Sequence, residues 1–160
     1  MEKRVVRFTL NGKPVKYEVE PSATLLRALR AEGVTSVKRG CEEGECGTCT
    51  VLLDGTPVKS CLILALEVEG RSVTTAEGLL GPNGELHPVQ RAFVEEGGIQ
   101  CGFCTPAMVL TAYALLRDNP CPTEDQIKEA ISGNLCRCTG YAGIIRAVKR
   151  AAELMREERR

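Results

Sequence analysis

Nine cysteines stand in a chain of 160 residues, and their spacing constrains the possible fold more than any other feature. Eight of them fall into two groups, one within residues 41–61 and the other within residues 101–138. The sequence shows no apolar leader and no run long enough to span a membrane, so we expect a cytoplasmic protein in a reducing compartment. Clustered thiols in that compartment favour metal ligation over disulfides, and an odd number of cysteines also argues against complete pairing.

The first group has the spacing Cys41-x4-Cys46-x2-Cys49, and Cys61 follows after eleven further residues. This is the spacing of a plant-type [2Fe–2S] site. Three thiolates on one short loop require a sharply turning backbone, which the three glycines of this segment allow. Zinc sites are usually built from C-x2-4-C pairs, and this triplet is a poor fit to them. We therefore predict a [2Fe–2S] cluster on these four cysteines, with Cys61 on the second strand of a hairpin that begins at Cys49.

The second group is Cys101-x2-Cys104, followed after 31 residues by Cys136-x-Cys138. A C-x-C pair presents two thiolates from nearly one point, which suits one iron of a compact cluster and crowds a tetrahedral zinc. Each pair is predicted to lie at the start of a helix, with Thr105 as the N-cap of the first. The free N–H groups and positive dipole end of a helix start favour an anionic cluster. The spacing by itself leaves zinc and an iron–sulfur cluster as alternatives.

Hydrophobic periodicity divides the chain into two parts. In the first part, apolar and polar residues alternate with a period of two. An Asn-Gly turn joins predicted strands over residues 5–10 and 15–20. A short apolar helix pattern follows within residues 21–33, and further strands are predicted between residues 49 and 75. Two strands, a helix and then more strands resemble a β-grasp arrangement.

The second part reads as helix after a stretch rich in Gly and Pro. Thr123 and Gln126 form a predicted capping box within it. The sequence therefore predicts an α+β chain with a β-grasp, plant-type ferredoxin-like domain over residues 1–76. A linker over residues 77–87 leads to an all-α domain resembling a four-helix bundle over residues 88–160.

The remaining polar residues give no sign of catalysis by this chain. The 21 basic residues balance the 21 acidic ones, which leaves no basic field for a nucleic acid. His87 is the single histidine, so a Rieske centre is excluded, and we expect it to begin a helix. Glu42, Glu43 and Glu45 are predicted to be solvated charges, and Cys121 a spare thiol in a turn. No nucleophile–base pair, phosphate-binding loop or pair of carboxylates is placed for catalysis.

Three segments carry a resemblance to a known family: CEEGECGTC at 41–49, QCGFCTP at 100–106 and GNLCRCTGY at 133–141. Together, and in this order, they closely resemble the iron–sulfur subunit of the molybdenum hydroxylases. This family includes xanthine dehydrogenase, aldehyde oxidoreductase and carbon monoxide dehydrogenase. The resemblance covers nearly the whole chain. Ala107 departs from it, because the family usually has glycine there, and we expect only a small change in packing.

The resemblance implies a second [2Fe–2S] cluster, held by Cys101, Cys104, Cys136 and Cys138 in a helical domain. It also implies that Gln100 and Cys138 contact the pterin of a molybdenum cofactor bound to a partner subunit. Cys138 would then be the place where electrons reach this chain.

The function implied is electron transfer within a larger oxidoreductase. Single electrons would pass from the molybdopterin centre of a large subunit, through two [2Fe–2S] clusters, to FAD on a medium subunit. The assembly would be a heterotrimer or a dimer of heterotrimers, and this chain would bind no substrate. Two alternatives remain at this point, a stand-alone ferredoxin with two clusters and an interaction module stapled by zinc.

Overall fold

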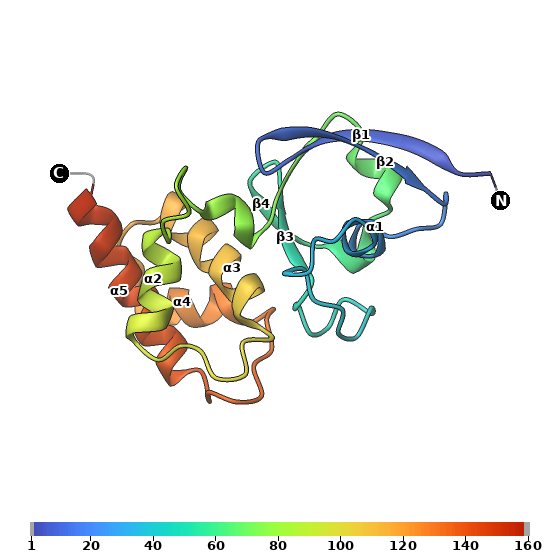
Figure 1. Ribbon diagram of the computed structural model, residues 1–160. Helices are drawn as coiled ribbons and strands as arrows, with labels where there is room; N and C mark the ends of the chain where they lie inside the picture. Colours follow the sequence, from blue (N-terminus) through green and yellow to red (C-terminus); the bar gives the residue numbers. More distant parts are fainter. Residues whose placement is uncertain (1, 159–160) are drawn as a thin grey trace.

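A computed structural model describes residues 2–158, and it places a five-stranded sheet beside a group of helices (Figure 1). The α+β class predicted from the sequence is confirmed. The strands are β1 (Arg4–Leu10), β2 (Lys13–Val19), β3 (Thr50–Leu53), β4 (Thr56–Lys59) and β5 (Ser72–Thr74). The α-helices are α1 (Leu25–Ala31), α2 (Pro88–Glu95), α3 (Thr105–Asp118), α4 (Glu124–Ile131) and α5 (Ala142–Glu158). Short 3₁₀ helices are η1 (Ser60–Leu62), η2 (Ala65–Val68) and η3 (Ala76–Leu79).

The strands are ordered β2-β1-β5-β3-β4, with β1 and β5 parallel and the other neighbours antiparallel. The predicted Asn11-Gly12 turn joins β1 to β2, and both residues have positive φ, 50° and 77°. The side chain of Asn11 also exchanges two hydrogen bonds with Thr75, at 2.8 and 2.9 Å. The first hairpin is therefore tied to the chain segment that follows β5. We call the region from β1 to η3 the sheet half.

Helix α1 begins at Leu25, four residues after residue 21, where the predicted helix pattern opens. Thr24 is its N-cap and accepts a hydrogen bond from the backbone of Arg27. Thr24 also pairs with Leu64 in an isolated β-bridge, and the residues before it form a turn in which the N–H of Ala23 donates to the carbonyl oxygen of Glu20. The buried face of α1 packs onto sheet residues such as Val6 to form the core of the sheet half. The buried residues of α1 are Leu25, Leu26, Ala28 and Leu29.

The prediction that Cys61 lies on a strand is wrong. Strand β4 ends at Lys59, and Cys61 lies in η1. The chain leaves the sheet here because Ile63 accepts a hydrogen bond from Leu25 at the start of α1, at 2.7 Å. The buried hydroxyl of Ser60 donates to the carbonyl oxygen of Cys49 at 2.7 Å, and the turn thus carries Cys61 back towards Cys49.

Helices α2 to α5 form the helical half, around a core of their own. Helix α3 is buried on most of its surface, as expected for a helix in the middle of a group. The predicted capping box of Thr123 and Gln126 is present at the start of α4. This helix ends at Ile131, with Ser132 as its C-cap. Within residues 2–158, no helix combines the length and the apolar character needed to cross a membrane.

His87 begins α2, as predicted. Its Nδ1 atom accepts a hydrogen bond from the backbone of Val89 at 3.2 Å. Its ring packs edge-to-face with that of Tyr113, and the two ring centroids lie 5.2 Å apart. Burial lowers the pKa of His87 below its usual 6.5, against a smaller opposing effect of Glu158. The neutral imidazole is the form that can accept this capping bond.

The pH dependence of stability follows from that shift. Since the folded pKa is lowered, the contribution of His87 is fully present above about pH 6.5 and is lost as pH falls through the folded value. We expect the unfolding temperature of wild type to fall more between about pH 7 and pH 5 than that of His87→Asn, which keeps an acceptor without titrating there. Thermal unfolding of both proteins across this range measures the difference. An equal fall in both would contradict the role given to His87.

The two halves are joined through a small apolar contact and the segment between them. Leu52 of β3 packs against Leu110 and Ala114 of α3 in a buried cluster, with Leu79 at its margin. Arg117 on α3 reaches across to the β3–β4 turn, where it donates to the carbonyl oxygen of Gly55 at 2.9 Å. Figure 1 shows α3 facing the β3–β4 hairpin, while α5 lies on the far side of the helical half.

Candidate metal centres

The loop before β3 brings two of the predicted ligands together. The backbone N–H of Cys41 donates to the Sγ atom of Cys46, and the N–H of Cys46 donates to the Sγ atom of Cys41, both at 3.4 Å. The N–H of Glu43 also donates to the Cys41 sulfur at 3.4 Å. Mainly because of these N–H groups, the pKa of Cys41 is lowered to about 7. The loop therefore favours a thiolate at this position.

The backbone of Gly40, just before this loop, lies so close to two side chains of the loop that there is no room for a Cβ atom. A Cβ atom added to Gly40 would lie 2.7 Å from both the Sγ atom of Cys46 and the Oγ1 atom of Thr48. The loop then turns through positive φ at Glu42, Gly44 and Gly47. Glycine removes the steric cost at two of these positions, while Glu42 needs other support.

Glu42 is held by two arginines and is not the freely solvated charge that we expected. Its carboxylate contacts Arg27 of α1 at 2.9 Å and Arg39 at 2.6 Å, and only 21% of its side chain is exposed. Hydrogen bonds from these two guanidinium groups lower the pKa of Glu42. The ion pairs fix the cysteine loop to α1, and only Arg39, three positions away, could have suggested this from the sequence.

The other two cysteines of the first group are buried beside each other. Cys49 is 2% exposed and Cys61 is 6% exposed. Burial, followed by the neighbouring Cys49 thiol, raises the pKa of Cys61 to about 11. The first group thus consists of two thiol pairs, Cys41 with Cys46 and Cys49 with Cys61.

The second group also divides into two pairs. The Sγ atoms of Cys101 and Cys138 lie 3.5 Å apart, and both residues are exposed. Cys104 is buried, and its thiol faces Cys136. Burial, followed by this neighbour, raises the pKa of Cys104 to about 12. All four cysteines line a surface pocket of about 440 Å³ together with Phe103, Leu135, Arg137 and Tyr141.

Cys136 is stabilised as a thiolate by its own loop. Burial alone would raise its pKa, but hydrogen bonds from Thr139 and from the backbone of Cys138 outweigh burial and lower the pKa to about 7. The phenol oxygen of Tyr141 accepts the backbone N–H of Cys136 at 2.9 Å. The hydroxyl of Thr139 lies 3.1 Å from the Cys136 sulfur.

Of the two sequence motifs, Cys101-x2-Cys104 and Cys136-x-Cys138, only the first lies at a helix start. Cys104 is the N-cap of α3, one residue earlier than the predicted cap at Thr105. Helix α5 begins at Ala142, so Cys138 lies in the loop before it, and that part of the prediction is wrong. The reason is local, because Tyr141 has a positive φ of 66°, which a helix cannot include.

The arrangement of the thiols fits a cluster with two irons at each group. Within residues 2–158, no three His, Cys, Asp or Glu side chains gather closely enough to hold one metal ion. The fold brings thiols together two by two, and a [2Fe–2S] cluster needs two protein ligands at each iron. The N–H groups directed at the Cys41 sulfur would also offset the negative charge of such a cluster.

The other sequence-predicted residues lie as follows. Gln100 is exposed directly before Cys101, and exposed apolar side chains of Ile99, Phe103 and Leu135 surround the second group. Cys121 stands apart from both groups, where it is exposed and accepts a hydrogen bond from Arg156 at 3.0 Å.

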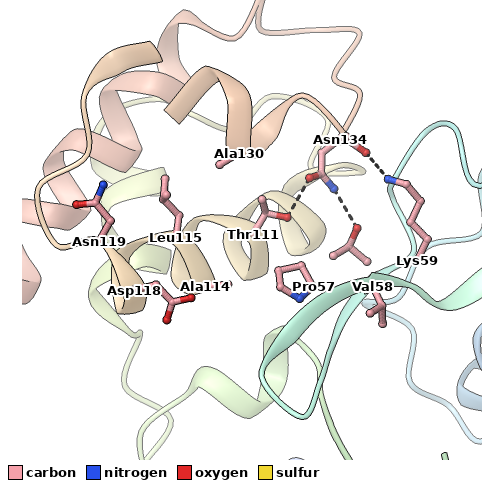
Figure 2. Close-up of a pocket in the computed structure, with 12 residues that line it drawn as sticks. Pro57, Val58, Lys59, Thr111, Ala114, Leu115, Asp118, Asn119, Ala130 and Asn134 are labelled. Atoms are coloured by element: carbon pink, nitrogen blue, oxygen red, sulfur yellow. Dashed lines mark hydrogen bonds between the residues drawn. The ribbon is translucent and has the colours of Figure 1, made fainter. Parts of the chain in front are cut away.

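The two cysteine groups meet at a buried polar junction, which no pattern in the sequence had indicated. Asn134, in the loop before Cys136, is 4% exposed and spans the gap between the halves. Its side chain joins Thr111 of α3 to the chain around Thr50. Figure 2 shows Asn134 and Thr111 directed towards each other. A groove of about 500 Å³ runs beside it between β4, α3 and α4, with Pro57 and Leu115 among the lining residues.

Comparison with known proteins agrees with two cluster sites. The chain matches a family described as "2Fe-2S iron-sulfur cluster binding domain" over residues 8–79 and one described as "[2Fe-2S] binding domain" over residues 75–149. It is 48% identical to the nicotinate dehydrogenase small FeS subunit of Eubacterium barkeri, over 96% of this chain and 98% of that protein.

Two solved structures extend the comparison to the fold. A chain of quinoline 2-oxidoreductase from Pseudomonas putida 86 superposes with a TM-score of 0.93 at 46% identity, covering 98% of both chains. The aldehyde oxidoreductase of Desulfovibrio desulfuricans matches 99% of this chain with a TM-score of 0.91 at 42% identity. The match covers only 18% of that chain, so the same unit there forms part of a longer polypeptide. With cysteines, fold and relatives in agreement, this chain belongs to the family of electron-transferring iron–sulfur subunits of the molybdenum hydroxylases, which bind two [2Fe–2S] clusters.

Proposed function

We propose that each thiol pair holds one iron. Cys41 with Cys46 and Cys49 with Cys61 would then bind the first cluster. The second cluster would lie between the pair Cys101 and Cys138 and the pair Cys104 and Cys136. The observation that carries this assignment is the pairwise grouping of all eight thiols, with 3.5 Å between the sulfurs of Cys101 and Cys138.

The finer arrangement of the chain is part of the same proposal. We assign residues 1–76 to a β-grasp domain, residues 77–87 to a linker and residues 88–160 to a domain resembling a four-helix bundle. The mixed sheet packed on α1 and the separate core of α2 to α5 support this division. All nine cysteines are free thiols, which favours the cytoplasm as the compartment.

Each [2Fe–2S] cluster, when bound, accepts and passes on one electron at a time. The residues around the second cysteine group suit contact with the subunit that supplies the electrons. Cys101 and Cys138 are exposed there, and Phe103 and Leu135 are large apolar side chains that are 45% and 54% exposed. Such a patch around a functional site is typical of a protein interface. We therefore place the large, molybdenum-binding subunit on this face, with Gln100 and Cys138 against the pterin.

The first cysteine group would face the medium subunit that binds FAD. Leu62 and Leu64, next to Cys61, are 64% and 42% exposed and could pack against that partner. The three subunits would form a heterotrimer or a dimer of heterotrimers. Nicotinate, quinoline and aldehydes, which the names of the relatives contain, are the first substrates to test on the assembled enzyme.

Replacing Gln100 with alanine tests the proposed path of electrons. In the enzyme purified with its molybdenum and flavin subunits, we expect Gln100→Ala to keep both clusters but to slow their reduction by substrate. The side chain is exposed and lies next to Cys101, so its loss removes a contact to the partner and no contact within the chain's core. Rapid mixing with substrate, followed by cluster absorbance, measures the rate, while dithionite shows that both clusters remain reducible.

The control is Gln90→Ala, which removes a glutamine amide on α2 that accepts from the backbone of His87 and donates to the carbonyl oxygen of Ala76. It is expected to leave the rate of cluster reduction unchanged. An unchanged rate in Gln100→Ala would remove this residue from the path. Isolation of the chain with two clusters but without stable partner subunits would instead favour a stand-alone ferredoxin.

A further inference from the structure

The buried side chain of Asn134 makes three hydrogen bonds at the junction of the two halves. Its Oδ1 atom accepts from the hydroxyl of Thr111 at 2.9 Å. Its Nδ2 atom donates to the carbonyl oxygen of Gly47 at 2.9 Å and to the hydroxyl oxygen of Thr50 at 3.1 Å. Thr50 in turn donates its hydroxyl to the same carbonyl oxygen at 2.7 Å. One carboxamide therefore connects α3 to the loop that carries the first cysteine group.

The two cysteine loops touch through their backbones at the same place. The N–H of Leu135, next to Cys136, donates to the carbonyl oxygen of Cys46 at 2.9 Å. Gly47 packs so closely that an added Cβ atom would overlap the carbonyl oxygen of Gly133. One predicted ligand of each cluster is thus connected to the other by a single hydrogen bond and a few covalent bonds. The hydrogen bond from Leu135 to Cys46 lies next to Asn134 on one loop and next to Gly47 on the other.

We propose that Asn134 is a positioning residue for electron transfer between the two clusters, an inference that rests on the proposed function. Its carboxamide holds the first cysteine loop against the second and so sets their separation and relative orientation. Asparagine suits this position because one carboxamide both donates to the carbonyl oxygen of Gly47 and accepts from the hydroxyl of Thr111. An aspartate at this position could accept from Thr111 but could not donate to Gly47. Its second oxygen would then face the carbonyl oxygen of Gly47 with no hydrogen between them, which is costly in a buried site.

Lys59 makes a second link across the junction, but a weaker one. Its ammonium group donates to the carbonyl oxygen of Gly133 at 2.8 Å (Figure 2). This contact lies at the surface, where water competes for the lysine. Asn134 and Thr111 are 4% and 7% exposed, so their hydrogen bonds define one geometry.

The test is the magnetic interaction between the two clusters in the complete enzyme after reduction with dithionite. It is measured by electron paramagnetic resonance, as line splitting and as enhancement of spin relaxation. We expect Asn134→Asp and Thr111→Val to retain the wild-type iron content and both reduced signals, yet to show a weaker interaction. Thr111→Val is nearly isosteric and removes only the hydroxyl, so it serves if Asn134→Asp does not fold. Thr111→Ser keeps the donor and is expected to restore the wild-type interaction.

The control separates positioning from general stability. Leu154→Ala truncates a side chain that is 5% exposed in the helical core, and Leu154 makes no contact in the junction described above. It should lower the unfolding temperature and leave the magnetic interaction at its wild-type value. A wild-type interaction in Thr111→Val or Asn134→Asp would overturn the role of Asn134, while the two signals would still support the electron-carrying function. Failure of the proposed function would look different, because wild type itself would then lack two reduced signals.

Discussion

Cys49→Ser is expected to remove one of the two reduced [2Fe–2S] signals and about half of the iron, and Cys136→Ser to remove the other signal. A serine hydroxyl deprotonates far less readily than a thiol and is a poorer ligand for iron. Cys49 and Cys136 belong to different thiol groups, and each is paired within its own group. Because the groups lie in separate halves with separate cores, loss of one cluster should leave the other intact.

The measurement is electron paramagnetic resonance of the dithionite-reduced variants together with iron and sulfide analysis. Cys121→Ser is the matched control, because Cys121 is exposed and stands apart from both groups. It should retain both signals and the full iron content. Loss of both signals in a folded Cys49→Ser or Cys136→Ser protein would contradict the division into two sites. Loss of either signal in Cys121→Ser would contradict the choice of ligands.

Gly47→Ala is expected to be the most damaging small substitution outside the cysteines. Gly47 has a φ of 68°, and an added Cβ atom would overlap the carbonyl oxygen of Gly133 and lie 2.9 Å from the Nδ2 atom of Asn134. Backbone strain at positive φ costs about 1–2 kcal/mol. Overpacking in a closed site adds roughly 1–3 kcal/mol. The sum is a large part of the stability of a chain of this size.

Gly70→Ala isolates the contribution of the clash. Gly70 has almost the same φ, 71°, but nothing lies within 4 Å of an added Cβ atom. It should therefore show the backbone strain alone, and both reduced signals should be unchanged. Thermal unfolding and resonance spectra of the two variants give the comparison. Equal destabilisation of both variants would show that the loops have room to separate, contrary to the close packing at Gly47.

Much of the local structure could be predicted because its causes lie within a few residues. The Asn11-Gly12 turn, the cap at His87 and the capping box at Thr123 depend on neighbours that the sequence shows directly. The start of α1 and the place of Cys61 were predicted less well. Both depend on the bridge between Thr24 and Leu64, whose partners lie far apart in the chain.

The sequence by itself determined the class of cofactor, because the spacing of the first four cysteines predicts one [2Fe–2S] cluster and the family motifs around the other four imply a second. It did not determine how the two groups are connected. Asn134 contacts a carbonyl oxygen 87 positions away, and Glu42 is held by Arg27 of another element. No local pattern marks such contacts, since they exist only once two separately formed cores have packed together. Tertiary structure alone therefore decided the distance and orientation between the two sites, on which electron transfer depends.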